Sequence, residues 1–200
     1  MFKVLLLDLD GVLRIWDPDL TGAVEHAHGL PEGTLSVAAF APHRLIPALT
    51  GAVDDQAWRN SVIEAIAAEH GEAAHAAVND WMVPTGSVDP DVLDIVRDAR
   101  QHLRVVLFSN ATSRLADDIE RLGLADEVDA VVSSADVGLA KPDPDVFSRI
   151  ALANRLMFSE IAFVDRAAQN VATAEILGIR SHLYAGVDGL RDFVGGVLSS

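Results

Sequence analysis

Two carboxylates directly behind an apolar run are the residues of this sequence whose types and spacing best suit chemistry. Residues 2–7 are almost entirely apolar, and Asp8, Asp10 and Gly11 follow them. A carboxylate can attack phosphorus to form an aspartyl-phosphate, and a carboxyl two residues on can protonate the leaving oxygen and later activate water. This spacing requires the strand to end and turn, which Gly11 permits. Taken singly, each acid also fits a helix cap or a solvated turn.

Further polar residues stand at the ends of other apolar runs. Ser109 and Asn110 follow one run, Asp165 ends another, and Lys141 lies in a loop rich in proline and aspartate. Ligands of doubly wound sheets bind beyond the carboxyl ends of the strands, so we expect these side chains to meet Asp8 and Asp10 in one crevice. Taken alone, Ser109-Asn110 fits a turn, Lys141 an exposed charge, and Asp165 the cap of a following helix.

The elements that must position these residues alternate between two patterns. Short apolar runs predict strands at residues 2–8, 104–109, 130–133, 161–165 and 180–184. Helical patterning lies between and after them, at residues 91–102, 113–122, 143–154, 167–177 and 190–198. Strands that alternate with helices predict an α/β fold with a doubly wound, Rossmann-like parallel sheet and right-handed crossovers.

Residues 17–84 interrupt this alternation, because they are rich in Ala, His and Glu and carry helical patterning, as in residues 56–70. We expect a helical insertion there and a core formed by residues 1–16 and 85–200, with residues 86–90 as the return linker. Several aromatic and imidazole side chains in or beside the insertion could contact a substrate: Trp16, Trp58, Trp81, His26, His28, His43 and His75. Burial in the helical core and simple surface exposure are the stronger expectations for them.

Composition excludes several function classes. A net charge of −15 and a pI near 4.6 disfavour nucleic acid and anionic membranes as partners. The absence of cysteine excludes disulfides, thiolate catalysis and zinc–thiolate sites. The apolar run leads straight to Asp8 and no apolar stretch is long enough to span a bilayer, so we expect a cytoplasmic protein without a cleavable leader. Oligomeric state is not readable from the sequence.

Four ordered motifs resemble those of the haloacid dehalogenase-like hydrolase superfamily. They are Asp8-Leu-Asp-Gly-Val-Leu13, Leu107-Phe-Ser-Asn110, Gly138-Leu-Ala-Lys-Pro-Asp143 and Phe163-Val-Asp-Arg-Ala-Ala-Gln-Asn-Val171. The sequence is most similar to small sugar-phosphate phosphatases, such as glucose-1-phosphate phosphatases and the phosphatase domain of soluble epoxide hydrolases. The resemblance covers nearly the whole chain except the insertion, which stands where this superfamily places a cap.

The resemblance implies a role for each motif. Asp8 would be the nucleophile and Asp10 the general acid and base, Ser109 and Asn110 would bind the phosphoryl group, and Lys141 would neutralise it. Mg²⁺ would bind Asp8, the backbone carbonyl of Asp10, and an acid of the fourth motif, here Asp165. Dehalogenases of this superfamily lack an acid at the place of Asp10. The resemblance therefore favours hydrolysis of a small phosphorylated metabolite, such as a sugar phosphate.

The fourth motif departs from the pattern, because Arg166 stands where the resembling enzymes carry the acid that binds the metal directly. A fixed positive charge should weaken Mg²⁺ binding unless the side chain turns away. Three outcomes stay open. Asp165 or Asn170 substitutes as ligand, Arg166 replaces the metal as a phosphate clamp, or catalysis is lost and a phosphate-binding or regulatory protein remains.

Overall fold

A five-stranded parallel sheet forms the centre of the computed structural model, which describes all residues from Met1 to Ser200. The strands are β1 (Val4–Leu7), β4 (Arg104–Ser109), β5 (Ala130–Ser133), β6 (Ile161–Asp165) and β7 (Arg180–Leu183), in the spatial order β5-β4-β1-β6-β7. Each pair of neighbouring strands is parallel. The sequence order runs outward from β1 in both directions, so the doubly wound topology predicted from the sequence is confirmed.

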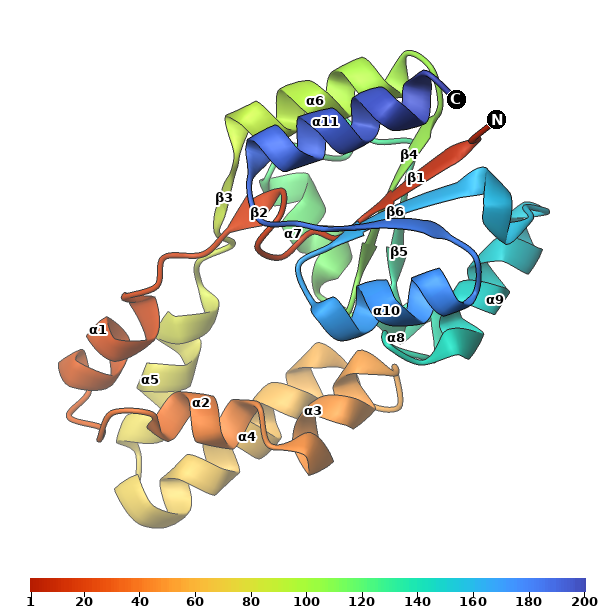
Figure 1. Ribbon diagram of the computed structural model, residues 1–200. Helices are drawn as coiled ribbons and strands as arrows, with labels where there is room; N and C mark the ends of the chain where they lie inside the picture. The colour runs from red at the N-terminus through yellow and green to blue at the C-terminus, as the bar shows by residue number, and fades with distance from the viewer.

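Both faces of the sheet are buried, and alternate residues of one strand enter different cores. Leu5 and Leu7 pack with α6 (Pro90–Arg100), α7 (Leu115–Arg121) and α11 (Val187–Leu198) on one face. Val4 and Leu6 pack with α9 (Pro144–Asn154) and α10 (Ala168–Ile176) on the other. Figure 1 shows these two helical layers on opposite sides of the sheet. Burial on both faces explains why the strands are apolar throughout rather than alternating with polar residues.

The predicted strands and helices of the sheet domain are confirmed to within a few residues, and local caps fix several helix starts. Asp89 caps α6 by accepting hydrogen bonds from the backbone N–H groups of Asp91 and Val92, at 3.0 and 3.2 Å. Asp143 accepts from the N–H of Asp145 at the start of α9. In both helices a proline follows the cap, where its missing N–H costs nothing.

The chain leaves the sheet domain after a short strand, β2 (Arg14–Ile15), and returns through β3 (Ser87–Val88), which pairs with β2 in antiparallel fashion. Between them five helices form a separate lobe at the lower left of Figure 1, here called the helical lobe. They are α1 (Leu20–Ala27), α2 (Thr34–Ala39), α3 (Pro42–Leu49), α4 (Asp55–His70) and α5 (Ala73–Met82). The lobe has its own apolar cluster, in which Trp58 is 7% exposed. The five helices fall within residues 17–84, where the sequence predicts a helical insertion.

Three short elements have no counterpart in the sequence prediction: the β2–β3 pair, α8 (Ser134–Val137) and a 3₁₀ turn at Phe158–Glu160. Each has only two to four residues, too few for a periodic pattern to be recognised. No helix combines the length and the apolar character that a membrane crossing would need.

Candidate active site

Three of the residues that the sequence singles out, Asp8, Asp165 and Lys141, meet at the carboxyl ends of β1, β4 and β6. Register pairs Leu7 with Leu107 and with Val164, so the next residues along the three strands lie side by side. Lys141 reaches this point from its loop, and its Nζ donates to Asp8 Oδ1 at 2.9 Å, to Asp165 Oδ2 at 2.7 Å and to the carbonyl of Phe108 at 2.8 Å. All three N–H donors of the ammonium are thereby used.

Asn110 uses both polar atoms of its side-chain amide to hold the Lys141 loop in place. Its Nδ2 donates to the Lys141 carbonyl, and its Oδ1 accepts from the Lys141 N–H, both at 2.8 Å. The Lys141 side chain is only 1% exposed, whereas a lysine in a loop is ordinarily expected in solvent. The structure therefore makes Lys141 a buried counterion of two carboxylates.

Asp8 combines burial with an ion pair. Burial raises its pKa to about 6, the Lys141 ammonium acts in the opposite direction, and the Asp165 carboxylate adds to the increase. Its side chain keeps 11% of its surface exposed, and Oδ2 accepts no hydrogen bond from the protein. Asp8 thus has one oxygen fixed by an ammonium and one free for attack.

Asp10 lies in a different environment, because donors surround both of its oxygens. Oδ1 accepts from Arg14 Nε at 2.8 Å and from Trp16 Nε1 at 2.6 Å. Oδ2 accepts from Arg14 Nη2 at 2.9 Å and from Ser109 Oγ at 3.4 Å. The two predicted carboxylates are therefore differentiated: one pairs with a lysine in the interior and the other with an arginine at the edge of a cavity.

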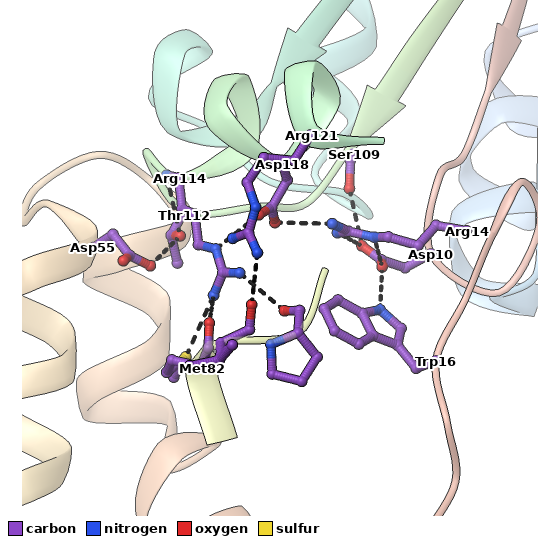
Figure 2. A network of polar contacts seen from close by, with 12 residues as sticks. Asp10, Arg14, Trp16, Asp55, Met82, Ser109, Thr112, Arg114, Asp118 and Arg121 are labelled. Atoms are coloured by element: carbon purple, nitrogen blue, oxygen red, sulfur yellow. Dashed lines mark hydrogen bonds and ion pairs between the residues drawn. The ribbon is translucent and has the colours of Figure 1, made fainter. Parts of the chain in front are cut away.

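Arg14 continues into a network that the sequence analysis missed (Figure 2). Its Nη1 donates to Asp118 Oδ2 at 2.9 Å, and Asp118 Oδ1 accepts from Arg114 Nε at 2.7 Å. Arg114 also donates to the carbonyls of Met82 and Pro84, at the end of the helical lobe. Asp118 is 104 residues away from Arg14 in the chain, so no local spacing links the two.

A cavity of about 480 Å³ lies between the sheet domain and the helical lobe. Asp10, Asn110 and Arg166 line it from the sheet domain, and Trp16, Phe40, Trp58, Trp81 and Met82 line it from the lobe and its linkers. All three tryptophans of the chain therefore reach the cavity wall, and Trp58 is at the same time buried in the apolar cluster of the lobe, as the sequence favoured. None of the histidines named from the sequence lines it.

Asp165 is engaged on both oxygens and is fully buried. Oδ1 accepts from the Ala167 N–H at 2.7 Å, and Oδ2 accepts from Asn170 Nδ2 at 2.9 Å in addition to Lys141. No group of three or more His, Asp or Glu side chains is placed to hold a metal ion. Lys141 holds one oxygen of Asp8 and one of Asp165, and the ligand predicted at position 10 is a backbone carbonyl rather than a side chain. A magnesium site formed by these three residues stays a prediction.

Arg166 lies over the turn that follows β1. Gly11 has φ +75°, and a Cβ added to it would lie 2.5 Å from Arg166 Cδ and 2.8 Å from Nη1. The positive φ favours glycine at this position, whereas the exposed arginine side chain could move aside from an added Cβ. The guanidinium makes no hydrogen bond or ion pair with the protein and is exposed at the cavity. It is a cation available to an anionic ligand, beside Asp10.

Comparison with solved structures gives the same fold at low sequence identity. A HAD family enzyme from Bacteroides thetaiotaomicron, in complex with magnesium and inorganic phosphate, has a TM-score of 0.72 and 21% identity over 91% of this chain and 93% of that one. A predicted HAD-like family hydrolase from Porphyromonas gingivalis has a TM-score of 0.69 and 21% identity, over 91% and 90%. An L-2-haloacid dehalogenase from Xanthobacter autotrophicus, with chloropropionic acid covalently bound, has a TM-score of 0.66 and 20% identity, over 100% and 85%.

A family model for haloacid dehalogenase-like hydrolases matches residues 2–178, which span the sheet domain up to the end of α10 together with the helical lobe. This match covers the four motifs, and the solved structures share the arrangement of the sheet that places them. The chain belongs to the haloacid dehalogenase-like hydrolase family.

Proposed function

We propose that the protein is a phosphatase of a small phosphorylated metabolite and that it works through an aspartyl-phosphate on Asp8. The observation that carries this proposal is the pair of differentiated carboxylates. Asp8 has one oxygen free beside a buried ammonium, and Asp10 lies two residues on, at the edge of a cavity. A carboxylate nucleophile with a separate acid and base is what ester cleavage at phosphorus needs.

In the first step Asp8 Oδ2 attacks phosphorus, the bond from phosphorus to the ester oxygen breaks, and Asp10 in its protonated form gives its proton to that oxygen. In the second step Asp10, now a carboxylate, takes a proton from water while the water oxygen attacks phosphorus. The bond to Asp8 then breaks and inorganic phosphate leaves. Lys141 balances part of the negative charge around Asp8 throughout.

The cavity supports a small substrate whose leaving group has a ring or an apolar face. Its volume of about 480 Å³ suits a metabolite, and Trp16, Phe40 and Trp81 present aromatic surface to it. A sugar phosphate fits this description through its ring faces. Closure of the helical lobe over the site would exclude water from the reacting centre.

Arg166 favours a second candidate, a catalytically weak phosphate-binding or regulatory protein. The family neighbours also include dehalogenases, which makes carbon–halogen cleavage a third activity to measure. Against it, a halide leaves without a proton and gives Asp10 no task.

One assay separates these candidates. Wild-type protein and Asp8→Asn are incubated with 4-nitrophenyl phosphate or with 2-chloropropionate, each with and without Mg²⁺, and release of phosphate or chloride is followed. We expect phosphate release by wild type alone and no chloride from either protein. Calorimetric binding of inorganic phosphate without any turnover would instead support the second candidate. Chloride release would support the third, and turnover by Asp8→Asn would remove the assigned nucleophile.

A further inference from the structure

The position of Asp10 depends on both chain segments that connect the helical lobe to the sheet domain. Trp16 lies on the segment that enters the lobe, and its indole N–H donates to Asp10 Oδ1 at 2.6 Å. Met82 and Pro84 lie on the segment that returns from the lobe, and they reach Asp10 through Arg114, Asp118 and Arg14. Figure 2 shows this continuous path of polar contacts from Asp10 to the return segment.

The link between Arg14 and Asp118 joins two opposite charges that are shielded from water, whereas the Asp10 side chain at the end of the path is 35% exposed. Arg14 is 4% exposed, and Asp118 is 5% exposed. Burial by itself would lower the pKa of the Arg14 guanidinium, but its hydrogen bonds and ion pairs with Asp10 and Asp118 raise it above the ordinary value for arginine, so Arg14 stays charged. A buried guanidinium held between two carboxylates has little freedom to rotate, because each lost contact would leave a charge unpaired.

Arg114 transmits the position of the return segment. Its Nη1 donates to the Met82 carbonyl at 2.5 Å and its Nη2 to the Pro84 carbonyl at 2.9 Å, while Arg121 Nη2 donates to the Val83 carbonyl between them at 2.9 Å. Three consecutive carbonyls at the base of the lobe are thus held by two arginines of the α7 region. A rotation of the lobe about its connections would break or stretch these bonds.

We propose that Arg14 and Asp118 are positioning residues that set the place of the Asp10 carboxyl according to the position of the helical lobe. This inference rests on the proposed function, in which Asp10 transfers a proton in both steps. The two-point contact of Arg14 fixes the carboxyl plane, and Asp118 fixes Arg14. Proton transfer is efficient only when the lobe is seated, because only then do Trp16 and the Arg114 contacts hold the carboxyl in place.

Dependence on the leaving group tests this role. An alkyl phosphate needs a proton on its leaving oxygen, whereas 2,4-dinitrophenyl phosphate expels a stable phenolate without one. For Asp118→Asn, which keeps the shape of the side chain, we expect kcat/KM to fall about 10- to 100-fold for the alkyl ester. For the dinitrophenyl ester the loss should stay below about threefold. Arg114→Lys, which keeps the Arg14–Asp118 pair, should show the same selectivity with a smaller loss.

Glu25→Gln is the matched control. Glu25 is a buried carboxylate of the lobe, 2% exposed, that accepts from the N–H groups of Gly33 and Leu35 and takes no part in the path. Any loss of kcat/KM in this variant should be equal for the alkyl ester and the dinitrophenyl ester. Thermal unfolding of each variant verifies that the comparison concerns folded protein.

The outcomes separate the inference from the proposed function. An active wild type with a selective loss in Asp118→Asn supports the inference. If wild type is active and the variants lose kcat/KM equally for both esters, or for neither, the positioning role is overturned. The proposed phosphatase activity is then unaffected. If Asp118→Asn does not fold, the same comparison of kcat/KM for the two esters is made with Arg114→Lys. A wild type inert toward both esters overturns the proposed function and this inference with it.

Discussion

At Asp8, burial and a neighbouring ammonium decide the pH at which the nucleophile carries its charge. Burial raises its pKa to about 6, against the effect of Lys141. Only the ionised carboxylate attacks phosphorus, so we expect kcat/KM for an aryl phosphate to rise with pH and to level off above a midpoint near this value. A profile from about pH 4.5 to about pH 8 measures it.

The phosphate group of the ester loses its second proton in a similar pH range. This ionisation must be distinguished from that of Asp8 in the pH profile. An ester with an electron-withdrawing leaving group has a lower second pKa, so a midpoint that belongs to Asp8 should not move with it. A midpoint that follows the ester, or a flat profile, would contradict the assignment.

Lys141 is the residue whose environment differs most from the expectation for a loop lysine. It balances Asp8 and Asp165, both buried. Lys141→Met keeps similar volume but leaves two neighbouring carboxylates without a counterion. We expect activity to be lost and stability at neutral pH to fall by about 3 kcal/mol or more. Taken alone in the sequence, Lys141 fits an exposed charge, and the structure instead buries it between two carboxylates.

The pH dependence of this destabilisation identifies its cause. Without the ammonium, the folded-state pKa of Asp8 rises further above its unfolded value, so the folded state favours the protonated acid. Stability is then retained at low pH and lost as pH rises through the folded-state pKa. Urea unfolding at about pH 5 should therefore show a smaller deficit than at about pH 7. Lys3→Met, which removes the only other lysine, 60% exposed, is the control and should cost little at either pH.

Among the elements, the turn between β6 and α10 carries the departure from the family pattern. Arg166 lies against Gly11 and leaves its guanidinium unpaired at the cavity. Arg166→Asp replaces a repelling charge with oxygen ligands beside Asp8 and Asp10. We expect Mg²⁺ to bind more tightly by at least about tenfold, with a rise in phosphatase activity. Calorimetric titration of Mg²⁺ into both forms measures the affinity.

Arg191→Asp makes the same charge change on α11, where Arg191 pairs with Asp188 in solvent, and should leave the Mg²⁺ affinity unchanged. If Arg166→Asp bound Mg²⁺ with equal or weaker affinity than wild type, Arg166 would not be standing in place of a metal ligand. Weaker binding of phosphate in metal-free buffer would then assign Arg166 as the cation that holds the phosphoryl group.

The long elements of the sheet domain were predictable, because their apolar patterns reflect burial that repeats along the chain. Continuous runs such as residues 104–109 become strands covered on both faces. The strand ends then locate Asp8, Ser109 and Asp165. The Arg14–Asp118–Arg114 path could not be predicted, since its members come from β2 and the α7 region and meet only through tertiary structure. The contact of Trp16 with Asp10 likewise depends on where the β2–β3 pair directs the chain.

At the scale of the whole molecule, two residues besides the connecting segments, Asp55 and Gly51, seat the helical lobe on the sheet domain. Asp55 of α4 accepts a hydrogen bond from Thr112 Oγ1 at 2.7 Å, and its N–H donates to Ser113 Oγ at 2.9 Å. Gly51, after α3, packs directly on the backbone of Ala135 in α8. Both residues lie between the end of α3 and the start of α4, so this end of the lobe rests directly on the sheet domain beside the cavity.

Gly51 offers a way to displace the lobe without touching the reacting residues. It has φ +70°, and an added Cβ would collide with the carbonyl oxygen of Ala135, a backbone atom that cannot move aside alone. Gly51→Ala should therefore push α3 away from α8. If closure excludes water and seats Asp10, we expect kcat/KM for an alkyl phosphate to fall by about tenfold or more while the protein stays folded.

Gly33→Ala separates this displacement from backbone strain. Gly33 lies in the same lobe with φ +85° and ψ −4°, in the left-handed region, and a Cβ there would meet nothing within 4 Å. An alanine in that region should cost about 1 kcal/mol of stability. Only Gly51→Ala adds the collision, so only this variant should lose activity and give a larger radius of gyration in small-angle X-ray scattering. Equal kcat/KM in the two variants would mean that the contact between α3 and α8 is not needed for turnover, and that the connecting segments alone hold the lobe over Asp10.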